Sequence, residues 1–501
     1  MVVQHNMQAA NANRMLNVTT SAQSKSTEKL SSGYRINRAA DDAAGLTISE
    51  KMRKQIRGLD QASTNAQDGV SSVQTAEGAL TEVHSMLQRM NELATQAANG
   101  TNSKDSDRQA IQDEIDQLTT EIDRVSETTK FNETYLLKGE DGTKTINMKA
   151  HDAGLKGKLT DNGDGTATFV MDTLNAGDKV SIGGKSYTIG SDDAEVEKWF
   201  TDNGNDVKDE ATKKVTVNGT EYTYYAAKAA NTTAGSLTDG WDAGWYASAP
   251  TDKGDGTGTA LSGKFANVDA IKAEVKKGAT VQNGTKSVTG MNDTTPKDGV
   301  SDTDATVISK NKAYELASKE LLKANQIGDT EGNAQVGTGA DVDVAVDLTH
   351  GDGTFSIKVG QAKVANSLAF SLHVGADADM TNKIQVNIDA MDSASLGIKG
   401  LNVKDDSGNA ATYAVDAISD AISKVSSQRS SLGAVQNRLE HTINNLDNVV
   451  ENTTTAESRI RDTDMAEEMV NYSKNNILAQ AGQSMLAQAN QSNQGVLSLL
   501  Q

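Results

Sequence analysis

The stretch MRKQIRGLDQASTNAQDGVSSVQTAEGALTEVHSMLQRMNELATQA, residues 52–97, has an apolar residue at every seventh position. A second apolar row occupies positions three residues after those of the first. Such a heptad repeat predicts a long helix that packs against partner helices along a narrow strip. The first row consists of Met52, Leu59, Ala66, Val73, Leu80, Leu87 and Ala94, and the second of Ala62, Ala76, Val83, Met90 and Ala97.

The C-terminal part of the chain carries a matching repeat. A shorter apolar pattern over residues 111–125 predicts one more helix, after a turn near residues 99–107. Because no single helix can bury such a row alone, we expect helices from both chain ends to share one bundle. The C-terminal row consists of Ile418, Val425, Leu432, Leu439, Leu446 and Ile460.

The middle of the chain, residues 138–369, has a different pattern. Gly-Asp-Gly-Thr occurs at 163–166, 254–257 and 351–354, and the first and third copies lead into alternating apolar and polar residues. Asp-Gly followed by alternation predicts β-hairpins, and a helix is expected within 310–328. The sequence therefore predicts a mainly α fold, an elongated coiled-coil-like bundle built from both chain ends, with an inserted β-rich outer region of one or two domains.

Composition narrows the classes of function. The 501 residues carry a net charge of −20, which argues against a general nucleic-acid binder, and they contain no cysteine, which excludes disulfides and thiolate metal sites. No signal peptide precedes the first helical pattern, and no window approaches the length of a membrane helix. These signals alone indicate a cytosolic protein, so that any export would need another route.

No pattern for catalysis, metal binding or a cofactor is found. The six histidines are scattered, and neither a zinc-peptidase motif, nor a phosphate-binding loop, nor a hydrolase nucleophile elbow is present. Asp161 and Asp164 in DNGDGT resemble a calcium loop, but their spacing is wrong and the twelfth position lacks a glutamate. Turn formation accounts for them better. We therefore expect a protein that is not an enzyme and needs no cofactor.

Both chain ends indicate assembly. The last helical stretch carries a loose apolar stripe and ends in clustered leucines, which would cause aggregation if they were exposed on a monomer and so imply a partner. An ordinary bundle with no assembly role is the alternative. Residues 30–46, LSSGYRINRAADDAAGL, predict a joint between two helices, at which Asp41 and Asp42 cap a helix or pair across subunits with Arg35 or Arg38. The apolar residues near the end are Met465, Met469, Ile477, Met485, Leu486, Leu497, Leu499 and Leu500.

Both arms resemble the bacterial flagellins. The resemblance is carried by 30–62, by LQRMNELATQAANG at 87–100, by 111–132, by SSLGAVQNRLEHTINNL at 430–446, and by ESRIRDTDMAEEM and QANQSNQGVLSLLQ near the C-terminus. It implies terminal inner-core helices from 1–40 and 459–501, and an outer-core helical domain from 41–137 and 370–458. A β-hairpin is implied near 370–403, after the variable insertion 138–369 rather than before it.

The resemblance also implies a function. Flagellins polymerise into a hollow extracellular filament for motility, after export in unfolded form through the flagellar type III route. Implied partners are further copies of the chain, an export chaperone on the C-terminal segment, the cap and hook-junction proteins, and innate receptors. Cytosolic inflammasome receptors would sense Leu497, Leu499 and Leu500. The Toll-like flagellin receptor would contact an exposed Leu93 beside Arg89, and in addition Gln88, Gln96 and Glu114.

The insertion leaves two other hypotheses open. It could be a catalytic domain such as a peptidase, although no metal or nucleophile constellation supports this. It could also be an adhesion or glycan-binding module, which its Ser/Thr-rich, tryptophan-containing composition permits.

The heptad positions expected to form the packing strip for assembly are Met52, Leu59, Val73, Leu80, Leu87, Ile418, Val425, Leu432, Leu439 and Leu446.

Overall fold

The computed structural model describes residues 6–99, 101, 106–229, 240–251, 263–294, 297–338, 353–405 and 408–498. The chain forms two compact units. The first comprises Met1–Thr75, Ala369–Asn387 and Ser430–Gln501, and the second comprises Ala76–Leu368 and Ile388–Arg429. The domain boundaries drawn from the sequence remain predictions. No helix in the described ranges is both long and apolar enough to cross a membrane.

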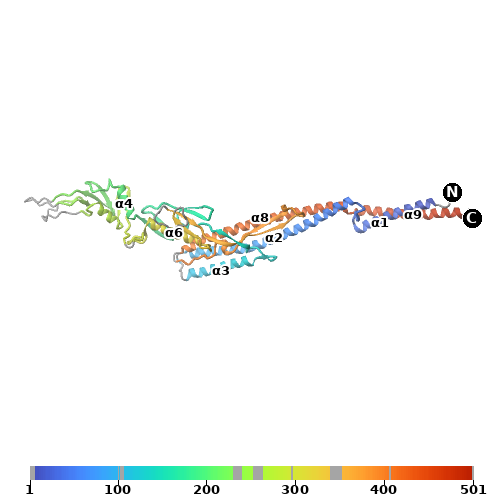
Figure 1. Ribbon diagram of the computed structural model, residues 1–501, viewed down its shortest axis with the longest axis horizontal. Helices are drawn as coiled ribbons and strands as arrows, with labels where there is room; N and C mark the ends of the chain where they lie inside the picture. The colour runs from blue at the N-terminus through green and yellow to red at the C-terminus, as the bar shows by residue number, and fades with distance from the viewer. Residues whose placement is uncertain are drawn as a thin grey trace, which may run out of the picture. The chain divides into compact units, whose positions relative to one another are not determined.

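Five long helices come from the two chain ends, as the sequence predicts. Figure 1 shows α1 beside α9, with the two termini at the same end of this pair, and α2 beside α8. The mainly α fold class with a β-rich insertion is therefore confirmed. The helices are α1 (Met7–Ser32), α2 (Ala43–Ala97), α3 (Asp107–Thr128), α8 (Asn409–Arg461) and α9 (Met465–Ser498).

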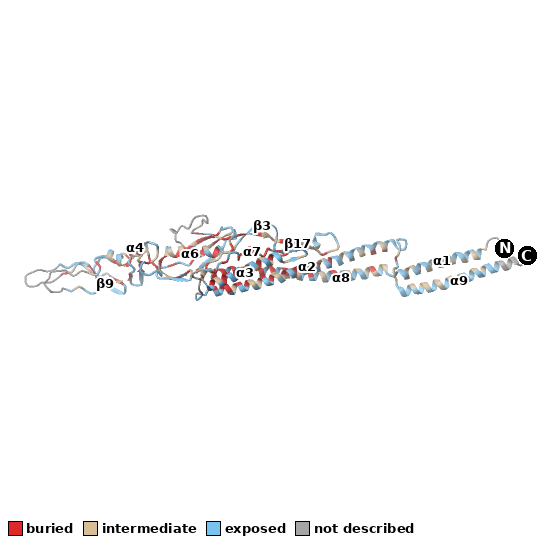
Figure 2. Ribbon diagram, turned by 90° about the horizontal axis from the view of Figure 1, so that it is seen from below, coloured by how far each residue is buried: buried red, intermediate tan, exposed pale blue. Residues whose placement is uncertain are grey.

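The heptad rows are the buried strips of α2 and α8. In Figure 2 the buried positions gather where these helices run with α3, while α1 and α9 are mostly exposed. Met52 and Leu59, near the start of α2, are only half-buried. The alanines in the rows allow close helix approach with little side-chain volume. Buried heptad residues are Ala66, Val73, Leu80, Leu87, Ala94, Ile418, Val425, Leu432, Leu439 and Leu446.

Arg108 fastens the end of α2 to the start of α3 and of α8. Its side chain is 2% exposed. Its Nε donates to the carbonyl oxygen of Ala97 at 2.9 Å, and its Nη1 to that of Asp405 at 2.7 Å. The Asp405 carboxylate in turn accepts from the main-chain N–H of Asn409 at 2.9 Å. One guanidinium thus satisfies the Ala97 carbonyl, which the end of α2 leaves without an intrahelical partner, and joins it to the loop before α8.

A two-stranded sheet packs on α2 and α8 in the first unit. It is formed by β17 (Leu368–His373) and β18 (Lys383–Ile388). Gly69 of α2 permits close approach, because a Cβ there would lie 2.2 Å from Leu372 Cδ1. The predicted hairpin is therefore present but shorter than 370–403. Asp392 caps a separate short helix, α7 (Ser393–Leu396), which ends at Gly397 with a φ of 76°.

The described part of the insertion consists of small sheets and three helices around two apolar cores. The first core lies between α6 and the sheets of β4–β7 and β13–β15, and the second between α4, α5 and the five-stranded sheet. The predicted Asp-Gly hairpin joins β4 to β5, a Gly183-Gly184 turn joins β6 to β7, and the predicted helix is α6. The 254–257 motif lies outside the described residues, as does the start of the 351–354 motif. The helices are α4 (Asp193–Asp202), α5 (Val268–Val275) and α6 (Lys310–Asn325).

The strand that leads into the insertion pairs with the strand that leads out of it. β3 leaves the helical part and is antiparallel to the returning strand β16, with Asn147 opposite Gln361. The pairing continues at Met148, whose N–H donates to the carbonyl of Gly360 at 2.8 Å. The outgoing and returning chains are therefore neighbours.

The strands of the described residues fall into six sheets. The small ones are β1 (Lys130–Phe131) with β2 (Thr134–Tyr135), β3 (Glu140–Asn147) with β16 (Gln361–Asn366), and β17 with β18. The four-stranded sheet has the spatial order β14 (Gln335–Thr338), β15 (Thr354–Lys358), β5 (Thr166–Met171) and β4 (Gly157–Asp161). The three-stranded sheet has the order β13 (Val307–Ser309), β7 (Lys185–Gly190) and β6 (Lys179–Ile182). The five-stranded sheet has the order β10 (Gly244–Tyr246), β9 (Thr220–Tyr225), β8 (Lys214–Val217), β11 (Thr280–Asn283) and β12 (Lys286–Thr289).

Candidate functional site

The joint, residues 33–42, lies between α1 and α2 as predicted. Gly33 ends α1 with a left-handed φ of 75° that favours glycine. The next residues then pair with the α8–α9 connection. The N–H of Arg35 donates to the carbonyl of Arg461 at 2.7 Å, and the N–H of Thr463 donates to that of Gly33 at 3.0 Å. Backbone hydrogen bonds therefore tie the two helix connections together.

Tyr34 is the side chain at the centre of the joint. The guanidinium carbon of Arg461 lies 4.7 Å from the centroid of its ring, and that of Arg53 lies 5.8 Å away. Both contacts have cation–π geometry. Arg53 also pairs with Glu457 at 3.5 Å, and Glu457 is only 8% exposed. Charged side chains from α2 and α8 thus surround one aromatic ring.

Both aspartates of the joint cap main-chain N–H groups, Asp41 within its own loop and Asp42 at the start of α2. Asp41 Oδ2 accepts from the main-chain N–H groups of Arg38 and Asn37 at 2.9 and 3.2 Å, and these bonds lower the pKa of Asp41. Asp42 Oδ1 accepts from the N–H of Gly45 at 2.8 Å, in the first turn of α2. The prediction that these aspartates cap a helix is confirmed for Asp42 alone.

The alternative, an ion pair of these aspartates with Arg35 or Arg38 across subunits, stays a prediction, because it joins two copies of the chain. Among the described residues of one chain, neither aspartate pairs with these arginines. The Arg38 guanidinium pairs with Glu28 at 2.9 Å, and Arg35 donates to the main-chain oxygen of Ile460. The reason is geometric, because the carboxylates turn toward main-chain N–H groups of their own loop.

The terminal helix pair, α1 and α9, exposes large apolar side chains. Met465, Met469, Ile477 and Met485 are 49%, 52%, 67% and 61% exposed, while Leu486 is half-buried. On α1, the exposed apolar residues are Met7, Met15 and Val18. Neither helix can bury such residues in the other, because each presents apolar side chains on more than one face.

A groove of about 770 Å³ runs between these two helices. Its walls include Met15, Leu16, Leu478 and Met485, together with the small residues Ala12, Ala481 and Gly482. One ion pair, Lys29 with Glu468 at 3.8 Å, links the helices near the joint. The side chain of Leu497 and residues Leu499 and Leu500 lie outside the described structure.

Four of the five predicted receptor residues are exposed on α2 or α3. Gln88, Arg89 and Gln96 are exposed on α2, and Glu114 is exposed on α3. Arg89 Nε donates to Glu114 Oε1 at 2.9 Å, and Arg89 also pairs with Glu92 at 3.2 Å. Both bonds raise the pKa of Arg89. The structure thus brings Arg89 and Glu114 together, while Gln88 and Gln96 are exposed on the same helix as Arg89.

The expectation that Leu93 is exposed is wrong. Its side chain is only 2% exposed. Leu93 lies outside the heptad rows but one turn beyond Arg89, on the side of α2 that faces α3. A helix that packs on two partners buries a wider strip than the heptad positions alone, which explains the error.

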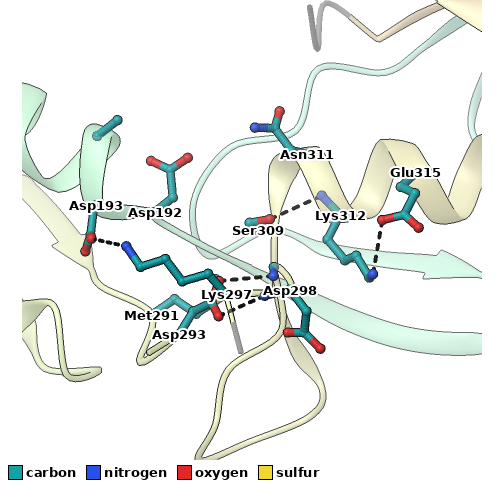
Figure 3. Close-up of a pocket in the computed structure, with 12 residues that line it drawn as sticks. Asp192, Asp193, Met291, Asp293, Lys297, Asp298, Ser309, Asn311, Lys312 and Glu315 are labelled. Carbon is teal, nitrogen blue, oxygen red and sulfur yellow. Dashed lines mark hydrogen bonds and ion pairs between the residues drawn. The ribbon is translucent and has the colours of Figure 1, made fainter. Parts of the chain in front are cut away.

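A pocket in the insertion is strongly polar. Its volume is about 400 Å³, and it lies between the first turns of α4 and α6. Figure 3 shows Lys297 reaching Asp193, while Lys312 turns to Glu315, at 2.8 and 3.0 Å. The Asp293 carboxylate accepts from main-chain N–H groups of its own loop. These charges hold the loop and the two helices together. Within the described ranges, no group of three His, Cys, Asp or Glu residues could hold a metal ion.

Sequence reasoning missed Tyr34, Arg53, Glu457 and Arg108. Tyr34 directly follows a glycine that ends a helix, and this position is the signal that could have identified it. Arg53 and Glu457 sit in repeats whose polar positions look solvated, and their pairing joins residues distant in sequence. Arg108 follows Ser106 and Asp107, residue types that normally indicate the exposed first turn of a helix.

Comparison with known proteins agrees with the helical arms. The model of the bacterial flagellin N-terminal helical region matches residues 3–141, and that of the C-terminal helical region matches 415–500. A flagellin of Clostridium tyrobutyricum is 36% identical over 498 residues, which are 99% of this chain and 100% of the relative. A flagellin of Bacillus subtilis (strain 168) is 33% identical over 501 residues, 100% of both chains.

Among solved structures, FliC from Burkholderia pseudomallei matches with 19% identity and a TM-score of 0.24, covering 74% of this chain and 99% of that one. Full-length identity above 30% and both matched helical regions assign the family. This chain belongs to the bacterial flagellins and is a structural, non-enzymatic subunit of the extracellular flagellar filament.

Proposed function

We propose that the terminal helix pair carries the contacts that polymerise the filament. The observation that supports this is the exposure of Ile477 and Met485 on α9 and of Met15 on α1, at 67%, 61% and 57%. Burial of each such side chain stabilises an interface by about 1.5–3 kcal/mol. Neighbouring copies of the chain would cover these side chains and the groove between α1 and α9.

Two variants test this proposal. Ile477→Asp is expected to leave a folded, soluble chain that does not elongate on filament seeds, since a charge cannot be buried in an apolar contact. Gln480→Asp, an equal change at an exposed polar position of the same helix, is the control. Deletion of 460–501 should also abolish polymerisation. Normal filaments, seen by electron microscopy, from either the Ile477 variant or the truncation would contradict the proposal.

We further propose that the α2–α3 face binds the host Toll-like flagellin receptor through Gln88, Arg89, Gln96 and Glu114. The support is the exposed cluster around the Arg89–Glu114 pair at 2.9 Å, since arginine is enriched at interface hot spots. Leu93 would act indirectly, by holding α2 against α3. Arg89→Ala should weaken receptor signalling by at least about tenfold, while Arg124→Ala on α3 should not. Unchanged signalling by Arg89→Ala would refute this assignment.

Export and capture before assembly complete the proposal. The chain would leave the cell unfolded by the flagellar type III route, with a chaperone on α9, and would join the filament beneath the cap and beyond the hook-junction proteins. The apolar surface of α9 supports the chaperone step, because such a surface needs cover. Leu497, Leu499 and Leu500 would serve inflammasome recognition. Loss of chaperone binding in the truncation lacking 460–501, with retained binding by Arg89→Ala, is the expected result.

A further inference from the structure

A second pocket lies in the part of the chain where the insertion meets α8. Its volume is about 350 Å³, which falls in the range of small-molecule sites. Half-buried Ile146, Met148 and Ile327 line it together with buried Leu396 and Ala417. Ile146 and Met148 lie at the end of β3, and Ile327 follows α6. Leu396 belongs to α7 and Ala417 to α8. Polymerisation, as proposed above, does not use this pocket.

Lys424 of α8 brings a positive charge into this pocket, and no described residue forms an ion pair with it. Its side chain is half-buried, and its Nζ donates to the main-chain oxygen of Ser395 at 2.5 Å. Burial lowers the pKa of its ammonium group. Removing an ammonium from water is costly unless an anion compensates it.

The carboxylates near Lys424 are engaged elsewhere. Asp389 accepts from the Ser367 hydroxyl at 2.6 Å and pairs with Lys144 at 3.5 Å. Asp392 caps α7 by accepting from the N–H of Ser395 at 3.2 Å. Lys424 therefore keeps two N–H donors for another group.

Ser395 adds a hydroxyl group without a hydrogen-bond partner to the same wall. The residue is 3% exposed, and its Oγ has no hydrogen-bond partner in the described part of the chain. Its N–H and carbonyl are both occupied, by Asp392 and Lys424. Buried hydroxyl groups almost always have a partner, so a lone hydroxyl in a pocket wall, next to an unpaired ammonium, indicates a missing acceptor.

The rest of the pocket does not favour a cation. Asp420 is the one acidic residue among the described residues that line it, and Lys149 neutralises Asp420 at 2.8 Å, with His151 Nε2 at 3.9 Å from the same carboxylate. The lining as a whole holds two lysines against one aspartate. A ligand with a negative end and an apolar body matches this distribution.

We infer that this pocket binds a small organic acid, whose carboxylate accepts hydrogen bonds from the Lys424 ammonium and the Ser395 hydroxyl. Its apolar body would lie against Ile146, Met148 and Ile327. Each polar group that lacks a partner then gains one, and the half-buried apolar walls become fully buried. An acidic side chain of a neighbouring copy is the competing occupant, which the experiment below separates.

The test uses the unseeded full-length chain and hexanoate as the probe. Calorimetry or saturation-transfer NMR should show one site with a dissociation constant of about 0.1–10 mM, as expected for so small a ligand. Hexanamide, which lacks the charge, should bind at least about tenfold more weakly. Hexylammonium should not bind. Equal binding of all three compounds would overturn the inference.

Variants identify the two donors. Lys424→Met should lower hexanoate affinity at least about tenfold, and Ser395→Ala about fivefold, by loss of hydrogen bonds to a charged group. Lys399→Met is the matched control, because Lys399 is exposed and lies outside the pocket lining. Circular dichroism checks folding, and Ser395→Ala, which removes one oxygen atom, decides the question if Lys424→Met does not fold.

Two outcomes would overturn the inference. The first is hexanoate binding that neither variant changes. The second is no binding to the monomer combined with impaired polymerisation of Lys424→Met, which would assign the pocket to a neighbouring copy. Loss of binding in both pocket variants with normal filament growth supports the inference, and it leaves the polymerisation proposal untouched.

Discussion

The guanidinium of Arg461, in the last turn of α8, lies over the ring of Tyr34 with 4.7 Å between its carbon atom and the ring centroid. The contact joins residues more than four hundred positions apart. It sits beside the backbone bond from Arg35 to Arg461 at 2.7 Å. One aromatic ring thus stabilises the contact between the α1–α2 connection and the α8–α9 connection.

Loss of this ring should loosen the joint. Tyr34→Ala removes both cation–π contacts and leaves a void, so we expect a cost of about 1–3 kcal/mol. Amide hydrogen exchange of Arg35 and Thr463, which bond across the joint, should then be at least about fivefold faster. Tyr34→Phe keeps the ring and serves as the control. Equal protection in Tyr34→Ala and the wild type would show that the ring does not stabilise the joint.

A methyl group at Gly45 should disrupt the start of α2. A Cβ at this position would lie 2.4 Å from Asp42 Oδ2 and 2.8 Å from Ile36 Cδ1. Gly45→Ala is therefore expected to lower the free energy of unfolding by about 1–3 kcal/mol. At Gly78, also within α2, a Cβ would meet no atom of the described residues within 4 Å. Gly78→Ala should stabilise the chain by about 0.5–1 kcal/mol, and urea unfolding followed by circular dichroism compares the two.

The buried guanidinium of Arg108 should be among the most sensitive single positions. Arg108→Met leaves the carbonyls of Ala97 and Asp405 without their donors, so we expect a loss of about 2–4 kcal/mol. Arg124→Met on the same helix is the control, because Arg124 is exposed and pairs with Glu121 of its own helix. Thermal unfolding should separate the two variants clearly. Similar melting temperatures would contradict the role given to Arg108.

The cap formed by Asp41 predicts a specific pH dependence. Its hydrogen bonds from Arg38 and Asn37 lower the pKa of the carboxyl group below its ordinary 3.8. A carboxyl whose pKa is lower in the folded state stabilises the fold above the unfolded-state pKa, and this contribution is lost as the pH falls through the folded-state pKa. The melting-temperature difference between the wild type and Asp41→Ala should therefore be present at neutral pH and shrink below about pH 4. A difference that is independent of pH would contradict the cap.

The sequence predicts most of the helical part because its repeats are local and periodic. Leu432 and Leu439 occupy the same heptad row, and both are fully buried. Met52 and Leu59 continue their row near the start of α2, yet they stay half-buried. Periodicity identifies the face of a helix, but it cannot show how far along the helix a partner covers that face.

Contacts between distant segments could not be predicted in the same way. Leu93 looks exposed if α2 has one partner, and it is buried because α3 packs on its other side. The pairing of Arg53 with Glu457 and the position of Arg461 over Tyr34 depend on where two connections cross. No local pattern encodes that crossing. The turns of the insertion were predictable, since Asp-Gly and Gly-Gly readily adopt the positive φ that tight hairpin turns need, whereas the order of its strands was not.

The antiparallel pairing of β3 with β16 brings the outgoing and returning chains to within roughly 5 Å of each other. What lies between residues 148 and 360 can therefore differ in length and content while its two attachment points stay fixed. A short turn, or a foreign domain whose termini are adjacent, fits the same two points. This ribbon is a built-in grafting site, through which filaments of this chain could display a chosen protein in many regularly spaced copies.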